Sequence, residues 1–144
     1  MKILSRQLTL DLYNCSEKNL SQVEELKKIL SEIIGDEPRL ISEKIDGEHC
    51  AIIGAFIGGH IALHVYGELR YVAADIFTCD EYLEPEELSK VLKKFFKPDK
   101  IKSTSLKRGD FGKSDIKPKI KTRVAPLRKV KNAVVKTLVR RGEI

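Results

Sequence analysis

Two stretches of the chain repeat apolar residues at the spacing of an amphipathic helix. The first begins at Ser21-Gln22-Val23-Glu24, which has the S-x-x-E spacing of a capping box, and it ends at Gly35. The second carries Pro85 in its first turn and stops before Pro98. The sequence therefore predicts two helices, each packed by one face. The apolar stripes are Val23, Leu26, Ile29, Leu30, Ile33 and Ile34 in the first, and Leu88, Val91, Leu92 and Phe95 in the second.

Between these helices the pattern changes to short strand-like runs. Runs at 49–57, 60–66 and 69–77 are joined by Gly58-Gly59 and Gly67-Glu68, which is typical of antiparallel hairpins. Weaker runs lie at 3–14, 39–45 and 101–106. The order of elements lacks the regular strand–helix alternation of a parallel α/β protein. We therefore predict an α+β fold, in which an antiparallel β-sheet has two helices on one face.

Charge divides the chain of 144 residues into two parts, although its length fits one domain. Residues 113–144 hold eleven Lys and Arg against Asp115 and Glu143, a net charge of +9. The whole chain carries +6, so residues 1–112 carry −3. We expect a mildly acidic folded domain over 1–112 and a basic linker with an amphipathic C-terminal helix over 113–144.

The basic tail has helical spacing of its apolar residues from Leu127 to Leu138, and Lys117-Pro118-Lys119 before it reads as an extended linker. Three interpretations stay open: a helix packed on the domain or a partner subunit, a nucleic-acid backbone contact, and a contact with an acidic membrane or protein surface. No aromatic residue interleaves the charges, so base stacking is not favoured. The candidate contact residues are Arg128, Lys129, Lys131, Lys136, Arg140 and Arg141.

Composition and cysteine spacing indicate the class of protein and the compartment in which we expect it. It is 42% hydrophobic and 33% charged, which is enough for a core and is not typical of disorder. No apolar run is long enough for a transmembrane helix, and the first residues do not resemble a signal peptide. The three cysteines are far apart, which favours neither disulfides nor a metal site. We expect a cytoplasmic protein with no membrane span.

Alternation along 60–66 places His60, His64 and Tyr66 on one face of a strand. Ordinary polar groups on a half-exposed sheet face explain this pattern as well as a functional site does. His60 and His64 are four residues apart, about 13 Å on a strand, which is too far to share a metal ion. Cys79 precedes two acidic residues, which disfavours a thiolate nucleophile but permits a protonated thiol acting as an acid.

A motif without gaps runs from residue 59 to residue 79. It consists of Gly59-His60-Ile61-Ala62-Leu63-His64, Glu68, Tyr71, Ala73 and Asp75-Ile76-Phe77-Thr78-Cys79. It resembles the core of the prokaryotic S-adenosylmethionine decarboxylase family, whose pattern reads S-H-L-T-I-H-T-W-P-E-x-x-Y-x-x-x-D-x-F-T-C. Leu10-Asp11-Leu12-Tyr13-Asn14-Cys15 and Lys107-Arg108-Gly109 resemble flanking family segments. The resemblance covers about residues 1–110.

This resemblance implies a two-layer sandwich, commonly dimeric, that cuts its own chain. In the family a serine oxygen attacks the preceding carbonyl, and the new chain begins with a pyruvoyl group. That group is the electron sink for decarboxylation in polyamine biosynthesis. Gly59 stands at the serine position and has no side-chain oxygen, and no serine lies between Ser42 and Ser89. We therefore expect no self-cleavage, no pyruvoyl group and no other cofactor or metal.

The resemblance assigns remnant roles to the other motif residues. His64 matches the histidine that assists processing, and Cys79 matches the cysteine that protonates the decarboxylated carbon. His60, Tyr66 and Glu68 match positions beside the substrate. They imply a ligand-binding or regulatory homologue that takes S-adenosylmethionine or a polyamine and forms a homodimer or a heterodimer with an active relative. The alternatives are an active decarboxylase of S-adenosylmethionine or a basic amino acid, and binding of nucleic acid or an acidic partner through the tail.

Overall fold

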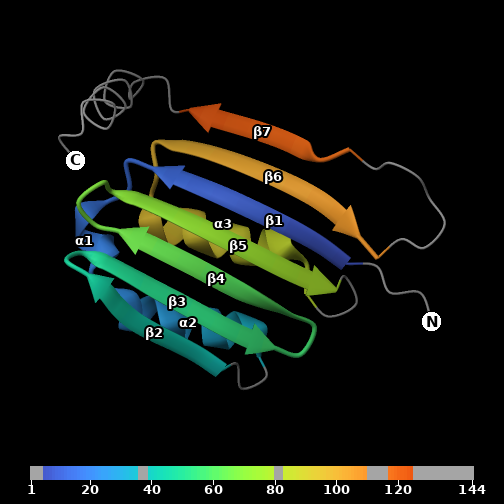
Figure 1. Cartoon of the computed structure of the whole chain (residues 1–144), viewed down its shortest axis with the longest axis horizontal. Coiled ribbons are helices and arrows are strands. Elements are labelled where there is room, and N and C mark those ends of the chain that lie inside the picture. Colours follow the sequence, from blue (N-terminus) through green and yellow to red (C-terminus); the bar gives the residue numbers. More distant parts are fainter. Residues whose placement is uncertain (1–4, 36–38, 80–82, 110–116, 125–144) are drawn as a thin grey trace.

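The computed structural model describes residues 5–35, 39–79, 83–109 and 117–124 (Figure 1). These residues form a seven-stranded antiparallel sheet in the order β2-β3-β4-β5-β1-β6-β7. The strands are β1 (Ser5–Tyr13), β2 (Arg39–Asp46), β3 (His49–Phe56), β4 (Gly59–Tyr66), β5 (Tyr71–Cys79), β6 (Lys100–Arg108) and β7 (Lys119–Val124). The helices are α1 (Glu17–Leu20), α2 (Val23–Ile34) and α3 (Pro85–Phe96).

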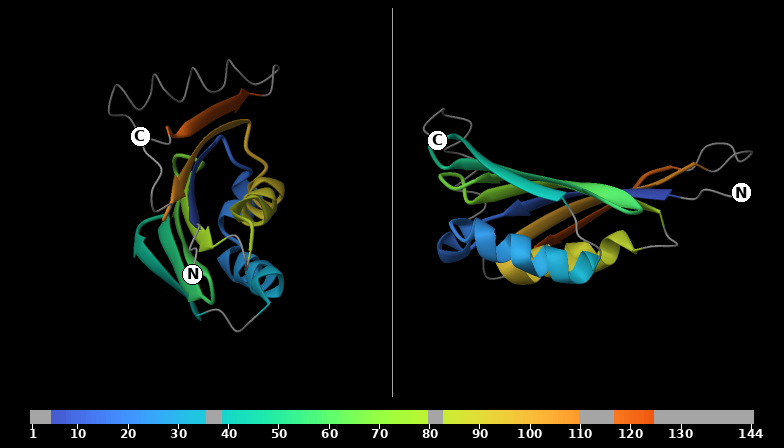
Figure 2. Two further views of the ribbon diagram at one scale, coloured as in Figure 1. Left: turned by 90° about the vertical axis from the view of Figure 1, so that its right-hand side faces the viewer. Right: turned by 90° about the horizontal axis from the view of Figure 1, so that it is seen from below.

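The helices lie together on one face of the sheet (Figure 2). No described helix covers the other face, which we call the open face. Alternate residues of the central strands point toward the helices because side chains on a strand alternate between faces. They form one core with the apolar stripes of α2 and α3, and the residues that anchor it include Leu10, Leu12, Leu26, Leu30, Ile61, Leu63, Ile76, Leu88, Leu92 and Phe96. The predicted α+β class, with an antiparallel sheet and helices on one face, is confirmed.

Two tight hairpins fix the register of the central strands. β3 and β4 pair Phe56 with Gly59, and β4 and β5 pair Tyr66 with Tyr71. Ile61, Leu63 and Val65 consequently face the core, while the histidines and tyrosine of β4 face the open side. The weaker predicted runs at 39–45 and 101–106 are β2 and β6.

The predicted capping box at Ser21 is wrong. Ser21 is the C-cap of a short helix that the sequence did not predict, α1, and its hydroxyl donates to the Lys18 carbonyl at 3.3 Å. The N-cap of α2 is Gln22, which makes no side-chain capping bond. Ser21 lies between α1 and α2. Its hydroxyl caps the C-terminal end of α1 and therefore does not cap the N-terminal end of α2.

The expected linker contains a strand. β7 pairs with β6 from Lys119 opposite Ser105 to Val124 opposite Lys100, so the sheet continues past residue 112. The predicted C-terminal helix and its basic residues lie outside the described residues. Within the described part of the chain, no helix is long and apolar enough to cross a membrane.

Candidate functional site

Stacked aromatic rings cross the open face of the sheet at one end. His49 of β3 stacks on Tyr66 of β4 with ring centroids 4.3 Å apart, and Tyr66 stacks on Tyr71 of β5 at 5.7 Å. Tyr71 in turn stacks on Tyr13 of β1 at 5.3 Å. His49 Nε2 and His64 Nδ1 lie 2.9 Å apart, so one imidazole donates a hydrogen bond to the other. We call these five residues the ring cluster.

Two phenol groups of the ring cluster, those of Tyr71 and Tyr13, have raised pKa values. The Tyr71 hydroxyl donates a hydrogen bond to Asp11 Oδ1. Burial raises the pKa of Tyr71, and the Asp11 carboxylate raises it further. Burial and Asp11 also raise the pKa of Tyr13, whose ring lies 5.2 Å from Lys100 Nζ. The phenol groups of Tyr13 and Tyr71 therefore stay protonated at neutral pH.

The opposite end of the sheet holds Gly59, His60 and Cys79. His60 and Cys79 lie on the open face, whereas Gly59 is at a position of β4 that alternates with His60 and pairs with the buried Thr78. Gly59 lies opposite Thr78 in the sheet, and the Cys79 N–H donates to the Gly58 carbonyl at 2.7 Å. His60 stacks on Phe77 with centroids 5.3 Å apart. The strand register thus brings Gly59 and Cys79 to one corner of the sheet.

The backbone around Gly59 leaves no room for a side chain. A Cβ atom built there would lie 1.9 Å from the Phe77 carbonyl oxygen and 3.0 Å from Thr78 Cα. Both neighbours are backbone atoms of β5, so they cannot rotate away as a side chain would. Beside this contact, the fully buried Thr78 hydroxyl has no hydrogen-bond partner among the described residues. Close approach of β4 to β5 therefore requires glycine at position 59.

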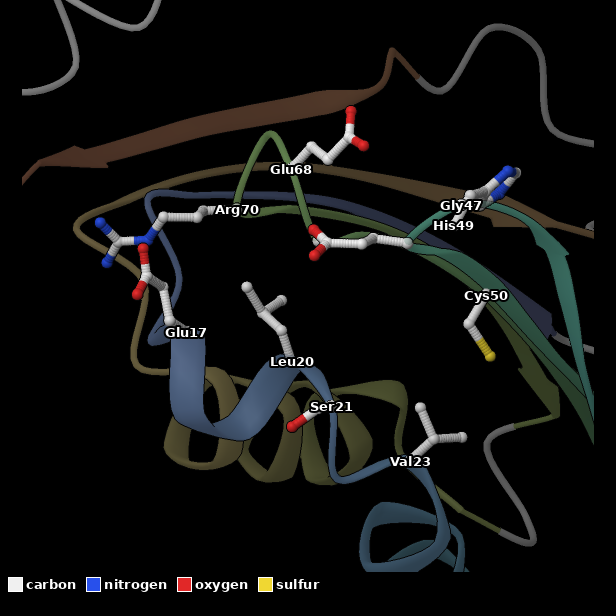
Figure 3. Close-up of a pocket in the computed structure, with 11 residues that line it drawn as sticks. Glu17, Leu20, Ser21, Val23, Gly47, His49, Cys50, Glu68 and Arg70 are labelled. Carbon is white, nitrogen blue, oxygen red and sulfur yellow. The ribbon is translucent and has the colours of Figure 1, made fainter.

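A cavity of about 660 Å³ lies on the helix side of the sheet, under the turns that join β2 to β3 and β4 to β5 (Figure 3). Figure 3 shows Cys50 and Val23 facing it from the sheet and from α2, with Glu17 and Arg70 side by side at its other end. Its volume is in the range of small-molecule sites. The remaining lining residues are Leu20, Ser21, Gly47, Glu48, His49, Gly67 and Glu68.

Carboxylates outnumber cations around this cavity. Glu17, Glu48 and Glu68 contribute three negative charges, against the single guanidinium of Arg70. Arg70 already makes a hydrogen bond within the protein, because its Nε donates to the Cys15 carbonyl at 2.7 Å. Burial raises the pKa of the Cys50 thiol, and Glu24 raises it further, so this wall stays neutral. The cavity is suited to a small ligand that carries positive charge.

The structure separates the residues singled out from the sequence into three places. Gly59, His60 and Cys79 share one corner of the sheet. His64 and Tyr66 belong to the ring cluster at the other end of β4, about 16 Å and about 23 Å from Gly59 at strand spacing. Glu68 lies beyond β4, on the wall of the cavity. These residues therefore do not form one site within a single chain.

His49 is the residue that links the ring cluster to the cavity, and sequence reasoning missed it as a site residue. It stacks in the ring cluster and also lines the cavity. The signal was present, since a tight hairpin between 56 and 59 places residue 49 opposite residue 66. The Tyr71–Asp11 bond joins residues 60 positions apart, which no local pattern indicates. Among the described residues, no group of three His, Cys, Asp or Glu side chains is placed to hold a metal ion.

A single antiparallel sheet with helices on one face and a ligand-sized cavity at its end defines a two-layer α+β protein. The family model described as S-adenosylmethionine decarboxylase matches residues 6–109. The chain belongs to the S-adenosylmethionine decarboxylase family.

Curated relatives agree with this membership, and solved structures share the fold. An S-adenosylmethionine decarboxylase proenzyme of Methanococcus maripaludis (strain C5) is 30% identical over 121 residues, covering 81% of this chain and 99% of the relative. One from Caldicellulosiruptor saccharolyticus is 29% identical over 115 residues, covering 77% and 93%. The crystal structure of adenosylmethionine decarboxylase from Aquifex aeolicus matches with a TM-score of 0.63 and 15% identity, over 81% of this chain and 100% of that one. A Trypanosoma brucei AdoMetDC monomer matches with a TM-score of 0.54 and 15% identity, and this chain covers 45% of it.

Proposed function

We propose that this chain is a member of the S-adenosylmethionine decarboxylase family that does not process itself and acts in polyamine biosynthesis as a ligand-binding or regulatory homologue. Gly59 is the observation that carries the proposal. It stands where the family pattern has the serine that becomes the pyruvoyl group, and it supplies neither an oxygen nucleophile nor a β-carbon. Homologues in the family are pyruvoyl-dependent, so the substitution removes the source of their catalytic group.

The surroundings of Gly59 support the same conclusion. The residues present do not fit a pyruvoyl group, because any Cβ at this position overlaps the Phe77 carbonyl oxygen. Position 59 thus lacks the room for a side chain as well as the oxygen nucleophile that processing requires. His64 and Cys79, which match the processing histidine and the proton-donating cysteine, then serve to position neighbouring groups rather than to carry out a reaction.

The 660 Å³ cavity is the proposed ligand site. S-adenosylmethionine and polyamines are cations, and the residues that line the cavity carry three carboxylates and one guanidinium. Of the residues that match substrate positions, Glu68 lines the cavity and Tyr66 stacks on its wall residue His49. His60 lies at the far corner of the sheet, so we do not include it in this site.

Isothermal titration of the full chain with S-adenosylmethionine, and separately with spermidine, tests the ligand proposal. We expect one of the two to bind, and Glu68→Gln to weaken its binding at least tenfold, since a charge-assisted contact of this kind contributes about 1.5–3 kcal/mol. Glu87→Gln removes the same charge from an exposed position of α3 and serves as the matched control. Absence of binding at millimolar concentrations, or equal losses in both variants, contradicts this site.

We also propose that the open face pairs with a second copy or with an active relative. His64 and Gly59 are about 16 Å apart on one strand, so His64 can reach position 59 only in another chain. The open face carries the ring cluster and the apolar side chains of Ile53 and Ile120, which are 55% and 61% exposed. A face with these features, which none of the described helices covers, is typical of an interface.

The runner-up function is an active decarboxylase of S-adenosylmethionine or a basic amino acid. The curated relatives named as S-adenosylmethionine decarboxylase proenzymes favour it. Release of labelled CO₂ from carboxyl-labelled substrates distinguishes the two functions, with the Methanococcus maripaludis relative as the positive control. We expect no release above the blank from this chain, and turnover that persists in repeated preparations supports the runner-up. The cytoplasmic location and nucleic-acid binding through the tail stay predictions.

A further inference from the structure

A second cavity, of about 310 Å³, lies where the sheet extends beyond α3. β6 and β7 continue the sheet past the helix layer, and α3 forms the wall beside them (Figure 2). The lining side chains come from the helix-facing side of β1, β6 and β7, from one face of α3, and from Lys117, two residues before β7. They are Arg6, Leu8, Glu86, Ser89, Lys93, Ser103, Ser105, Lys107, Lys117, Lys119 and Lys121.

Positive charge dominates this cavity. Six of its lining residues are Lys or Arg, and Glu86 is the single carboxylate among them. Arg6 already holds Glu86 in a two-point contact, Nη1 to Oε1 at 2.6 Å and Nη2 to Oε2 at 2.9 Å. The five lysines therefore have no carboxylate within the lining to balance their charge.

Lys93 of α3 lies near cations of β7. Burial lowers the pKa of Lys93, and the nearby cations Arg123 and Lys121 lower it further. An anion between α3 and β7 would relieve this repulsion. Ser103 and Ser105 lie opposite Lys121 and Lys119 on the neighbouring strand, and Ser89 faces the cavity from α3, so hydroxyl donors accompany the charges.

The cavity depends on a segment that the family model does not cover. The match ends at residue 109, whereas three of the lining lysines, Lys117, Lys119 and Lys121, come from β7 and the two residues before it. Ammonium groups and hydroxyls are the donors that phosphate oxygens accept from. A concave site of this volume is at the small end of ligand cavities, which suits a compact polyanion better than an extended strand.

We propose that this cavity binds an oligophosphate chain, either inorganic or carried by a nucleotide. The lysines of β7 and Lys93 of α3 hold the phosphate oxygens from two sides, and the serine hydroxyls donate from the floor. The site is separate from the 660 Å³ cavity, so the proposal stands independently of the proposed function.

Isothermal titration of the full chain with sodium tripolyphosphate at constant ionic strength tests it. We expect binding in the micromolar range, weakened at least tenfold by the double variant Lys93→Gln/Lys121→Gln. The matched control, Lys90→Gln/Lys102→Gln, removes the same charge from exposed positions that do not line the cavity, and its affinity should stay within twofold. Thermal unfolding without ligand shows whether each variant is folded.

Further ligands identify the source of the phosphate chain. Equal affinities for tripolyphosphate and ATP support an inorganic ligand, and at least tenfold tighter binding of ATP supports a nucleotide. Citrate tests whether any trianion is sufficient, and a single-stranded oligonucleotide tests nucleic acid. The proposal is overturned by equal losses in both double variants, by citrate binding as tightly as tripolyphosphate, or by an oligonucleotide that binds more tightly than either phosphate ligand.

Discussion

At Gly59, the missing side-chain nucleophile and the tight packing against β5 both argue against self-cleavage. Its Cα lies against the β5 backbone, and a Cβ would lie 1.9 Å from the Phe77 carbonyl oxygen. Restoring the family serine by Gly59→Ser should therefore fail to restore processing. It should also lower the free energy of unfolding by about 1–3 kcal/mol, the usual cost of overpacking. Chemical denaturation and intact mass measure the two effects.

Ala62→Ser is the control for Gly59→Ser, because it adds a hydroxyl to the open face of the same strand. We expect its free energy of unfolding to stay within about 0.5 kcal/mol of the parent chain. A Gly59→Ser chain that is as stable as the control and cleaves itself would show that β4 adjusts readily, and the steric argument would be wrong.

Cys15 gives the fold a dependence on alkaline pH. Burial raises its pKa from 9.0 to about 12, Asp99 also acts to raise it, and Arg70 partly opposes the shift. The folded state thus keeps a proton that the unfolded state loses, so the stability from this group is complete below pH 9 and is lost as pH rises toward 12. Cys15 should contribute a slope of about 1.4 kcal/mol per pH unit in that window. Cys15→Ala should flatten the slope in urea unfolding series, and an unchanged slope would contradict this account.

At the scale of elements, Arg6 and Glu86 connect β1 to α3. The contact is two-point, and the Arg6 side chain is 19% exposed whereas that of Glu86 is 45% exposed. Because solvent screens part of the attraction, we expect Glu86→Gln to lower the free energy of unfolding by about 1 kcal/mol. Glu24→Gln, which breaks the 3.6 Å contact with Lys27 on α2, is the control and should cost less than about 0.5 kcal/mol. Equal effects would mean that β1 and α3 do not depend on this pair.

The elements that the sequence predicted are those with strong local patterns. The apolar stripes of α2 and α3 and the glycine links of the central hairpins gave the helices, the hairpins and the fold class. α1 is too short for a periodic pattern, and the six residues of β7 contain four that are basic or hydroxylated. The partner of β7 across the sheet, rather than its own composition, makes it a strand.

The candidate site was less predictable than the fold, because its contacts join residues that are far apart in the sequence. The β4 residues could be assigned to one face, but the partners that give them a chemical setting come from other strands. His49 and Asp11 reach the ring cluster through strand order and register, as Glu17 reaches the cavity through α1. The tight contact at Gly59 likewise depends on how closely β4 approaches β5.

At the scale of the whole molecule, the open face predicts assembly. Ile53 is 55% exposed on that face, and Ile33 is 36% exposed on α2 in the helix layer. Sedimentation should give twice the chain mass of 16.3 kDa for the parent. Ile53→Asp should yield monomers because it buries a charge in the interface, while Ile33→Asp should remain dimeric. A monomeric parent chain at micromolar concentration would contradict homodimer formation.

The most direct test of the central claim is the intact mass of the freshly purified full chain under denaturing conditions. The account predicts one species near 16.3 kDa, because Gly59 cannot start the acyl shift that cleaves the chain. Two fragments, the C-terminal one with a blocked N-terminus, would show that the chain processes itself at another residue, and the proposal of a non-processing homologue would be wrong.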